Sequence, residues 1–102
     1  MDDLSRVHAI ATEACITFTK LYENSHVFSG AGAADGNIGG AVLDCFDTNK
    51  RIILAVTDQQ PNQTAIAVGH KNDEHFSMVG MFEISTLKVS RVLEIMEQHF
   101  AH

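Results

Sequence analysis

The sequence predicts an α+β fold: an N-terminal helix, an antiparallel meander sheet of four to five strands and a C-terminal helix, within a single domain of residues 1–102. Two observations carry this prediction. Apolar residues recur at steps of three and four near both ends of the chain, as in amphipathic helices. Between them, short apolar runs alternate with turn residues, and the turns are too short for the crossovers that parallel strands require.

The first helix is predicted from an apolar stripe along one side. The stripe consists of Leu4, Val7, Ala11, Ala14, Phe18 and Leu21, and Ile10 and Cys15 widen it. Asp2 and Asp3 precede it, where acidic residues cap a helix and complement its dipole. Asn24 and Ser25 are the expected stop signals. One apolar stripe of this kind indicates a helix that packs on a sheet.

Four strands are predicted in the middle of the chain, at residues 41–46, 52–57, 64–69 and 76–84. The segments between them, residues 47–50, 58–63 and 70–75, are rich in turn-forming polar residues. Val27 and Phe28 are candidates for the start of a fifth strand. The sequence leaves open whether residues 26–40 form strand or loop.

The last helix is predicted over an apolar face made by Val89, Val92, Leu93, Met96 and Phe100, with Ser85 or Thr86 as its cap. Two helices can cover one face of the sheet. In the strand at 76–84, simple alternation places Met78 on one face, the expected core side, and Met81 on the other. That other face is only partly polar, which predicts self-association, most simply as a homodimer.

Composition excludes several classes of function. The net charge is −6 and the seven basic residues are scattered, so nucleic acid is not an expected partner. No apolar run reaches the roughly 20 residues needed to cross a bilayer, and the N-terminus lacks a signal-peptide pattern, so no membrane partner is expected. Cys15 and Cys45 lie among apolar residues, which indicates reduced core thiols in a cytoplasmic protein.

The most unusual segment is the Gly-rich stretch at residues 29–40. Within this stretch we consider five glycine and polar residues as candidates for partner binding: Gly30, Gly32, Asp35, Gly36 and Asn37. The stretch superficially resembles a dinucleotide-binding turn, but a helix with this many glycines would be unstable. A loop, a bulged edge strand, or a loop that orders on a partner are the alternatives that the residues favour.

Histidines mark a second candidate site. His70 and His75 flank a short turn, and residues opposite each other on antiparallel strands lie within about 5.5 Å. The pair is a weak metal candidate because no third ligand is marked, so no metal is expected. His99 and His102 at the end of the chain suggest adventitious metal capture at most. Since no nucleophile has a neighbouring base, we expect no catalytic residues.

These observations lead to one main hypothesis. We expect a non-enzymatic protein-binding module of the adaptor, chaperone-like or inhibitor and immunity type, homodimeric and without a cofactor. Asp44, Asp47, Asp73 and Glu74 lie at strand ends or in turns and suit a basic protein partner. The alternative is a small-molecule or metal-binding domain that uses the Gly-rich segment at 29–40 or the pair His70 and His75.

Overall fold

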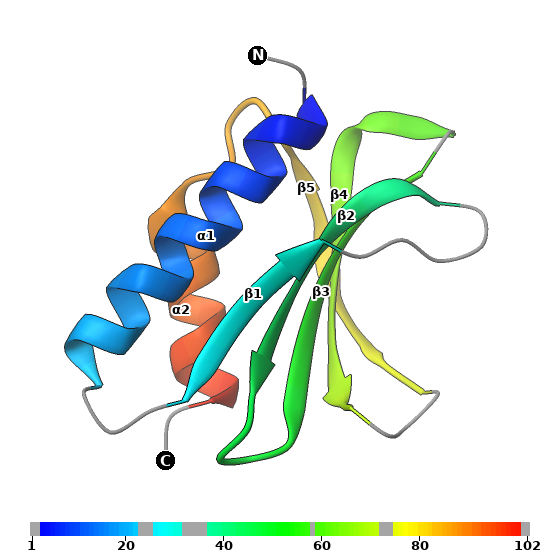
Figure 1. Ribbon diagram of the computed structural model, residues 1–102. Coiled ribbons are helices and arrows are strands. Elements are labelled where there is room, and N and C mark those ends of the chain that lie inside the picture. Colours follow the sequence, from blue (N-terminus) through cyan, green and yellow to red (C-terminus); the bar gives the residue numbers. More distant parts are fainter. Residues whose placement is uncertain (1–2, 23–25, 32–36, 58, 72–74, 101–102) are drawn as a thin grey trace.

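The computed structural model describes residues 3–22, 26–31, 37–57, 59–71 and 75–100. Its elements follow one another as α1 (Asp3–Leu21), β1 (Val27–Ala31), β2 (Asn37–Cys45), β3 (Lys50–Thr57), β4 (Gln60–His70), β5 (Ser77–Glu83) and α2 (Val89–His99). The strands form one antiparallel sheet in the order β1-β2-β3-β4-β5 (Figure 1). The predicted α+β fold is therefore confirmed, with five strands.

Both helices lie on the same face of the sheet, and the opposite face is left open (Figure 1). Strand alternation explains this two-layer arrangement, because successive side chains point to opposite faces. In β3, Ile52, Leu54 and Val56 are buried under the helices, whereas Ile53 and Ala55 on the other side are half-exposed. The large aliphatic side chains thus gather on one face and build the core there.

α1 buries most of the apolar stripe that the sequence predicts, but not the last residue of that stripe. Val7, Ala11, Ala14 and Phe18 of α1 are buried, but Leu21 is 59 % exposed because the helix ends at that residue. Across the layer, Phe18 meets Phe100 edge-on, with ring centroids 6.1 Å apart. This aromatic contact joins the C-terminal halves of α1 and α2.

The predicted turn at residues 58–63 is too long. β4 already begins at Gln60, which pairs with Thr57, so the connection is only two residues. Pro61 therefore lies inside a strand, although it has no backbone N–H to donate. It is tolerated because the register between β3 and β4 shifts between Ala55 and Thr57, and such irregularities are where sheets accept proline.

Residues 26–40, left open by the sequence, include two paired strands. β1 and β2 are antiparallel neighbours, with Val27 opposite Cys45 and Gly30 opposite Val42. Gly40 is required sterically, because a Cβ at this position would overlap the backbone carbonyl oxygen of Leu54 on β3. Gly40 thus permits a close approach between the backbones of β2 and β3.

The predicted cap of α2 at Ser85 or Thr86 is wrong. The helix is preceded by Lys88, which makes no side-chain capping hydrogen bond. Residues 83–87 instead form a turn in which the N–H of Leu87 donates to the carbonyl of Glu83 at 3.0 Å, and Leu87 is buried. Because Leu87 is buried in this turn, α2 begins only at Val89. No helix among the described residues is long and apolar enough to span a membrane.

Arg6 connects α1 to this turn. Its Nε donates to the carbonyl of Ile84 at 2.8 Å, and its Nη2 donates to the carbonyls of Leu87 at 3.2 Å and Ser85 at 3.4 Å. One guanidinium therefore satisfies three carbonyls in a connection that has few backbone hydrogen bonds of its own. The contact fixes the start of α2 relative to the start of α1.

We expect Arg6→Met to lower the free energy of unfolding by about 1–3 kcal/mol, because the carbonyls lose charge-assisted donors. Urea denaturation followed by circular dichroism measures the loss. Arg91→Met is the matched control, since Arg91 is exposed and its nearest acid, Glu94, is 3.7 Å away; its effect should stay within about 0.5 kcal/mol. Equal losses in the two variants would contradict the assigned role of Arg6.

Candidate functional site

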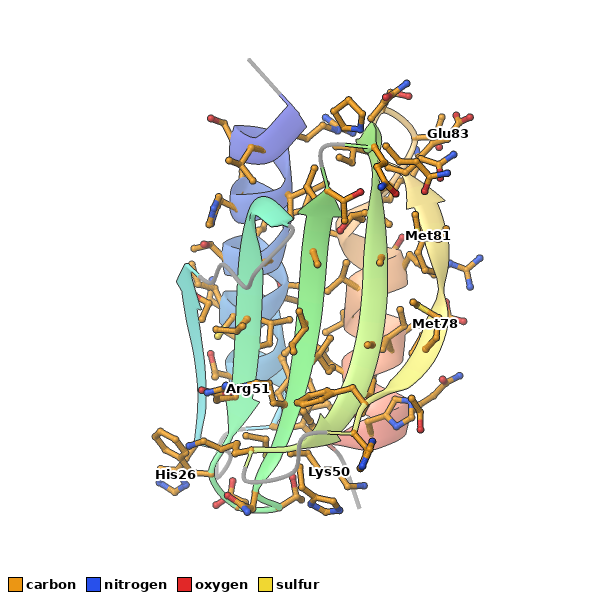
Figure 2. All side chains as sticks on the ribbon, turned by 90° about the vertical axis from the view of Figure 1, so that its right-hand side faces the viewer. His26, Lys50, Arg51, Met78, Met81 and Glu83 are labelled. Atoms are coloured by element: carbon orange, nitrogen blue, oxygen red, sulfur yellow. The ribbon has the colours of Figure 1, made fainter. Side chains whose placement is uncertain are left out.

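The open face of the sheet is the first candidate site. Figure 2 views the molecule from this side, with the helices behind the sheet. The strand register brings together, on neighbouring strands, Val42 with Ile53, Ile53 with Ala67, and Ala55 with Ala65. All five side chains are half-exposed and apolar. The middle of the face is therefore a flat floor of small and aliphatic side chains.

A ridge of methionines borders this floor. Met78 and Met81 of β5 are 63 % and 44 % exposed, and the register places them beside Ala67 and Ala65 (Figure 2). The expectation that alternation separates the two methionines, with Met78 in the core, is wrong. A β-bulge between Ile66 and Ala67 shifts the register, so both side chains reach the open face.

An ion pair lies at one end of the open face. Arg51 Nε donates to Asp44 Oδ1 at 2.6 Å, and Arg51 Nη2 donates to Oδ2 at 3.1 Å. The two residues are cross-strand partners in β3 and β2. These hydrogen bonds hold the pKa of Arg51 above its ordinary value. The carboxylate of Asp44 is thus already paired with a guanidinium.

Asp47 has an intramolecular role as well. Its Oδ2 accepts a hydrogen bond from the backbone N–H of His26 at 2.9 Å, and its Oδ1 lies 3.0 Å from His26 Nδ1. The backbone N–H of Phe46 in turn donates to the carbonyl of His26. These contacts fix the start of β1 against the β2–β3 turn. Partner contact at Asp44 and Asp47 stays a prediction.

The Gly-rich segment is only partly within the described residues. Gly30 lies in β1 and Asn37 begins β2, whereas Gly32, Asp35 and Gly36 lie outside the described residues. Because β1 and β2 are adjacent and antiparallel, they do not form the parallel strand–helix–strand unit of a dinucleotide site. Asp73 and Glu74 also lie outside the described residues.

The second candidate site is a cavity of about 420 Å³ on the helix-covered side of the sheet. It opens at the end of the molecule where α2 ends. Its lining combines one valine and one glycine with five polar side chains. The lining residues are Lys50, Val68, Gly69, His70, His75, Ser77 and His99. Val68 is buried at the base, whereas His70, His75 and Ser77 are exposed at the rim.

The fold brings these polar residues together from four places. Lys50 begins β3 and pairs with His70 at the end of β4, and Ser77 begins β5 opposite Val68. His99 comes from the last turn of α2. The sequence already suggested His70 and His75 as neighbours, but it missed Lys50 and His99. The alternation of β3 could have placed Lys50 on this side of the sheet, because Lys50 lies two residues before the buried Ile52.

Electrostatics distinguish His99 from the other cavity residues. Burial lowers the pKa of His99 below its ordinary value, and the nearby charge of Lys50 lowers it further. No group of three His, Cys, Asp or Glu side chains in the described part of the chain could hold a metal ion. The cavity therefore offers nitrogen donors and a positive charge rather than a set of metal ligands.

The two thiols are poorly suited to chemistry. Cys15 and Cys45 are both buried and unpaired, as the sequence suggests. Burial raises the pKa of Cys15, although a hydrogen bond with Ser29 opposes the rise. The Cys15 thiol also points toward the carbonyl oxygen of Val27 at 3.5 Å. A buried thiol with a raised pKa is a packing residue and a poor nucleophile.

Comparison with known protein families, curated proteins and solved structures gives no match to this chain. Any functional assignment must therefore be argued from the open face and the cavity themselves.

We expect His99 to make the protein less stable at acidic pH. Since folding lowers its pKa, the unfolded chain binds the proton more readily, and stability falls as pH drops below about 6.5, down to the folded-state pKa. Urea denaturation at several pH values should show a smaller acid loss for His99→Asn than for the wild type. His8→Asn on α1 is the control, and a wild-type pH profile in H99N would contradict the prediction.

Proposed function

We propose that this chain is a non-enzymatic protein-binding module that pairs with a second copy of itself through the open sheet face. The observation that carries the proposal is the apolar face formed by Val42, Ile53, Ala65, Met78 and Met81, which neither helix of the described residues covers. The largest apolar patch on a protein surface is often an interaction site.

The shape of the face supports a second copy as the occupant. One border carries the raised, flexible side chains of Met78 and Met81, and the middle carries the small side chains of Ala55, Ala65 and Ala67. In a twofold arrangement, the methionine ridge of each copy faces the alanine floor of the other. Methionine adapts to irregular surfaces, and a twofold interface requires such self-complementarity.

Charge also supports this arrangement. A chain of net charge −6 repels its own copies unless they meet through a neutral surface. On the open face Asp44 and Arg51 neutralise each other, and Glu83 lies at the far rim, at the end of β5 (Figure 2). The face is therefore the part of the sheet where two acidic molecules can meet with little repulsion.

The size of the face is sufficient for a weak or moderate dimer. Five strands at about 4.8 Å spacing, with roughly seven residues of about 3.3 Å each, make a face of roughly 550 Å². Two such faces bury roughly 1,100 Å², just above the roughly 1,000 Å² that a specific interface requires.

The role of the dimer follows from the remaining surface. We propose that it acts as an adaptor, chaperone-like protein or inhibitor, with the acidic turns, including Asp73 and Glu74, directed at a basic protein partner. The unpaired thiols of Cys15 and Cys45 support a reducing compartment such as the cytoplasm. The alternative predicted from the sequence, a small-molecule site, rests on the cavity and is developed below.

The double variant Met78→Glu, Met81→Glu should be monomeric, because it replaces the apolar ridge that meets the alanine floor of the other copy with two charges of the same sign. Sedimentation velocity over a dilution series measures the oligomeric state. Ile16→Glu is the matched control, since Ile16 is an apolar residue on α1 that is 50 % exposed, and its substitution should leave the dimer intact.

Two results would overturn the proposal. If the wild-type protein is monomeric at every concentration, a second copy does not occupy the face. If the wild type is dimeric and the methionine double variant dimerises equally well, the interface lies elsewhere. Dispersed amide signals in the NMR spectrum of the variant would establish that it is folded in either case.

A further inference from the structure

We propose that the cavity lined by Lys50, His70 and His99 binds the phosphate group of a small molecule. This site lies on the helix-covered side of the sheet, away from the open face, so it does not depend on dimer formation. Three features support this assignment: the charge of the lining, the donors of Lys50 and His70, and the size of the cavity.

The lining is positive and rich in donors. Among its described residues there is one lysine, three histidines and a serine, and no carboxylate. Lys50 offers three N–H donors, each imidazole offers one or two, and Ser77 offers a hydroxyl. Oxygen atoms of a phosphate accept from all of these groups, and bonds between charged partners are about twice as strong as neutral ones.

Lys50 lies beside the cavity on the helix-covered side of the sheet. It occupies a half-buried position of β3, in step with Ile52 and Leu54. Among the described residues, neither the ammonium of Lys50 nor the ring of His70 has a hydrogen-bond or ion-pair partner. An anion in the cavity can therefore accept hydrogen bonds from both groups.

Protonation of the His99 imidazole is coupled to anion binding in this cavity. The groups that face the cavity are Lys50 of β3, His70 of β4, His75 before β5, and His99 of α2. Lys50 disfavours protonation of His99 when the cavity holds no anion. A bound phosphate offsets the charge of Lys50 and favours the imidazolium, so binding should raise the pKa of His99.

The dimensions suit a small ligand. Known ligand sites occupy about 300–1,000 Å³ and combine an apolar surface with a few polar groups that fix orientation. Here Val68 and the backbone at Gly69 form the apolar base, and the polar side chains stand above it. A cavity of about 420 Å³ accommodates a phosphorylated metabolite-sized molecule and excludes a folded partner.

The test is an NMR titration of the wild-type protein with inorganic phosphate at constant ionic strength, followed on the imidazole signals. We expect saturable shifts of His70 and His99 and a rise in the pKa of His99 on binding. Acetate is the comparison anion. Acetate that binds as tightly as phosphate would overturn the assignment to phosphate.

Variants locate the site. Lys50→Met should weaken phosphate binding at least about tenfold. Lys71→Met is the matched control, since it removes the same charge from the neighbouring end of β4 but does not line the cavity; its affinity should change less than about twofold. His99→Gln provides a second test if K50M does not fold, and it should weaken phosphate binding because it removes a donor that can carry a positive charge.

Three results would overturn the proposal: shifts that do not saturate, equal losses in K50M and K71M, or an affinity of H99Q for phosphate equal to that of the wild type at the same pH. The first two would indicate an adventitious ion only. Repeating the titration on the Met78→Glu, Met81→Glu variant separates this site from the proposed function, because phosphate binding should survive loss of the dimer.

Discussion

The packing of both helices against one face of the sheet is the interaction on which the rest of this structure depends. Ile52, Leu54 and Ile66 are fully buried beneath α1 and α2, and burying such side chains contributes about 1.5–3 kcal/mol each. Because this one layer holds the core, side chains on the other face are free to be small. The flat alanine floor is therefore a consequence of where the helices lie.

The same arrangement separates the two candidate sites. The open face presents apolar side chains over a wide and shallow area, which suits a protein surface. The cavity lies between the sheet and the end of α2, where Lys50 and His99 approach each other from elements far apart in the sequence. A macromolecule and a small anion can thus be bound on opposite sides of the sheet without competing for the same residues.

The fold was predictable from the sequence because each element carries its own period, but local irregularities were not. Alternation failed at Met78 and Met81, where a bulge opposite Ile66 and Ala67 changes the register. Pairing between neighbouring strands decides such a shift, and no single strand reveals it. Of the cavity, only His70 and His75 were foreseen, because they flank one turn. His99 lines the cavity because α2 packs against the sheet there, and spacing along the chain does not reveal this tertiary contact.

The nearest-neighbour order of the strands has a consequence for how the chain folds. Every strand pairs with the one that follows it, so the sheet can grow by closing one short hairpin after another. The contact between Arg6 and Ile84 instead closes a loop of 78 residues, which is slow by comparison. During synthesis from the N-terminus, α1 is made before α2, and the apolar layer stays partly uncovered until α2 has left the ribosome. We therefore expect the nascent chain to be most vulnerable to aggregation before α2 emerges.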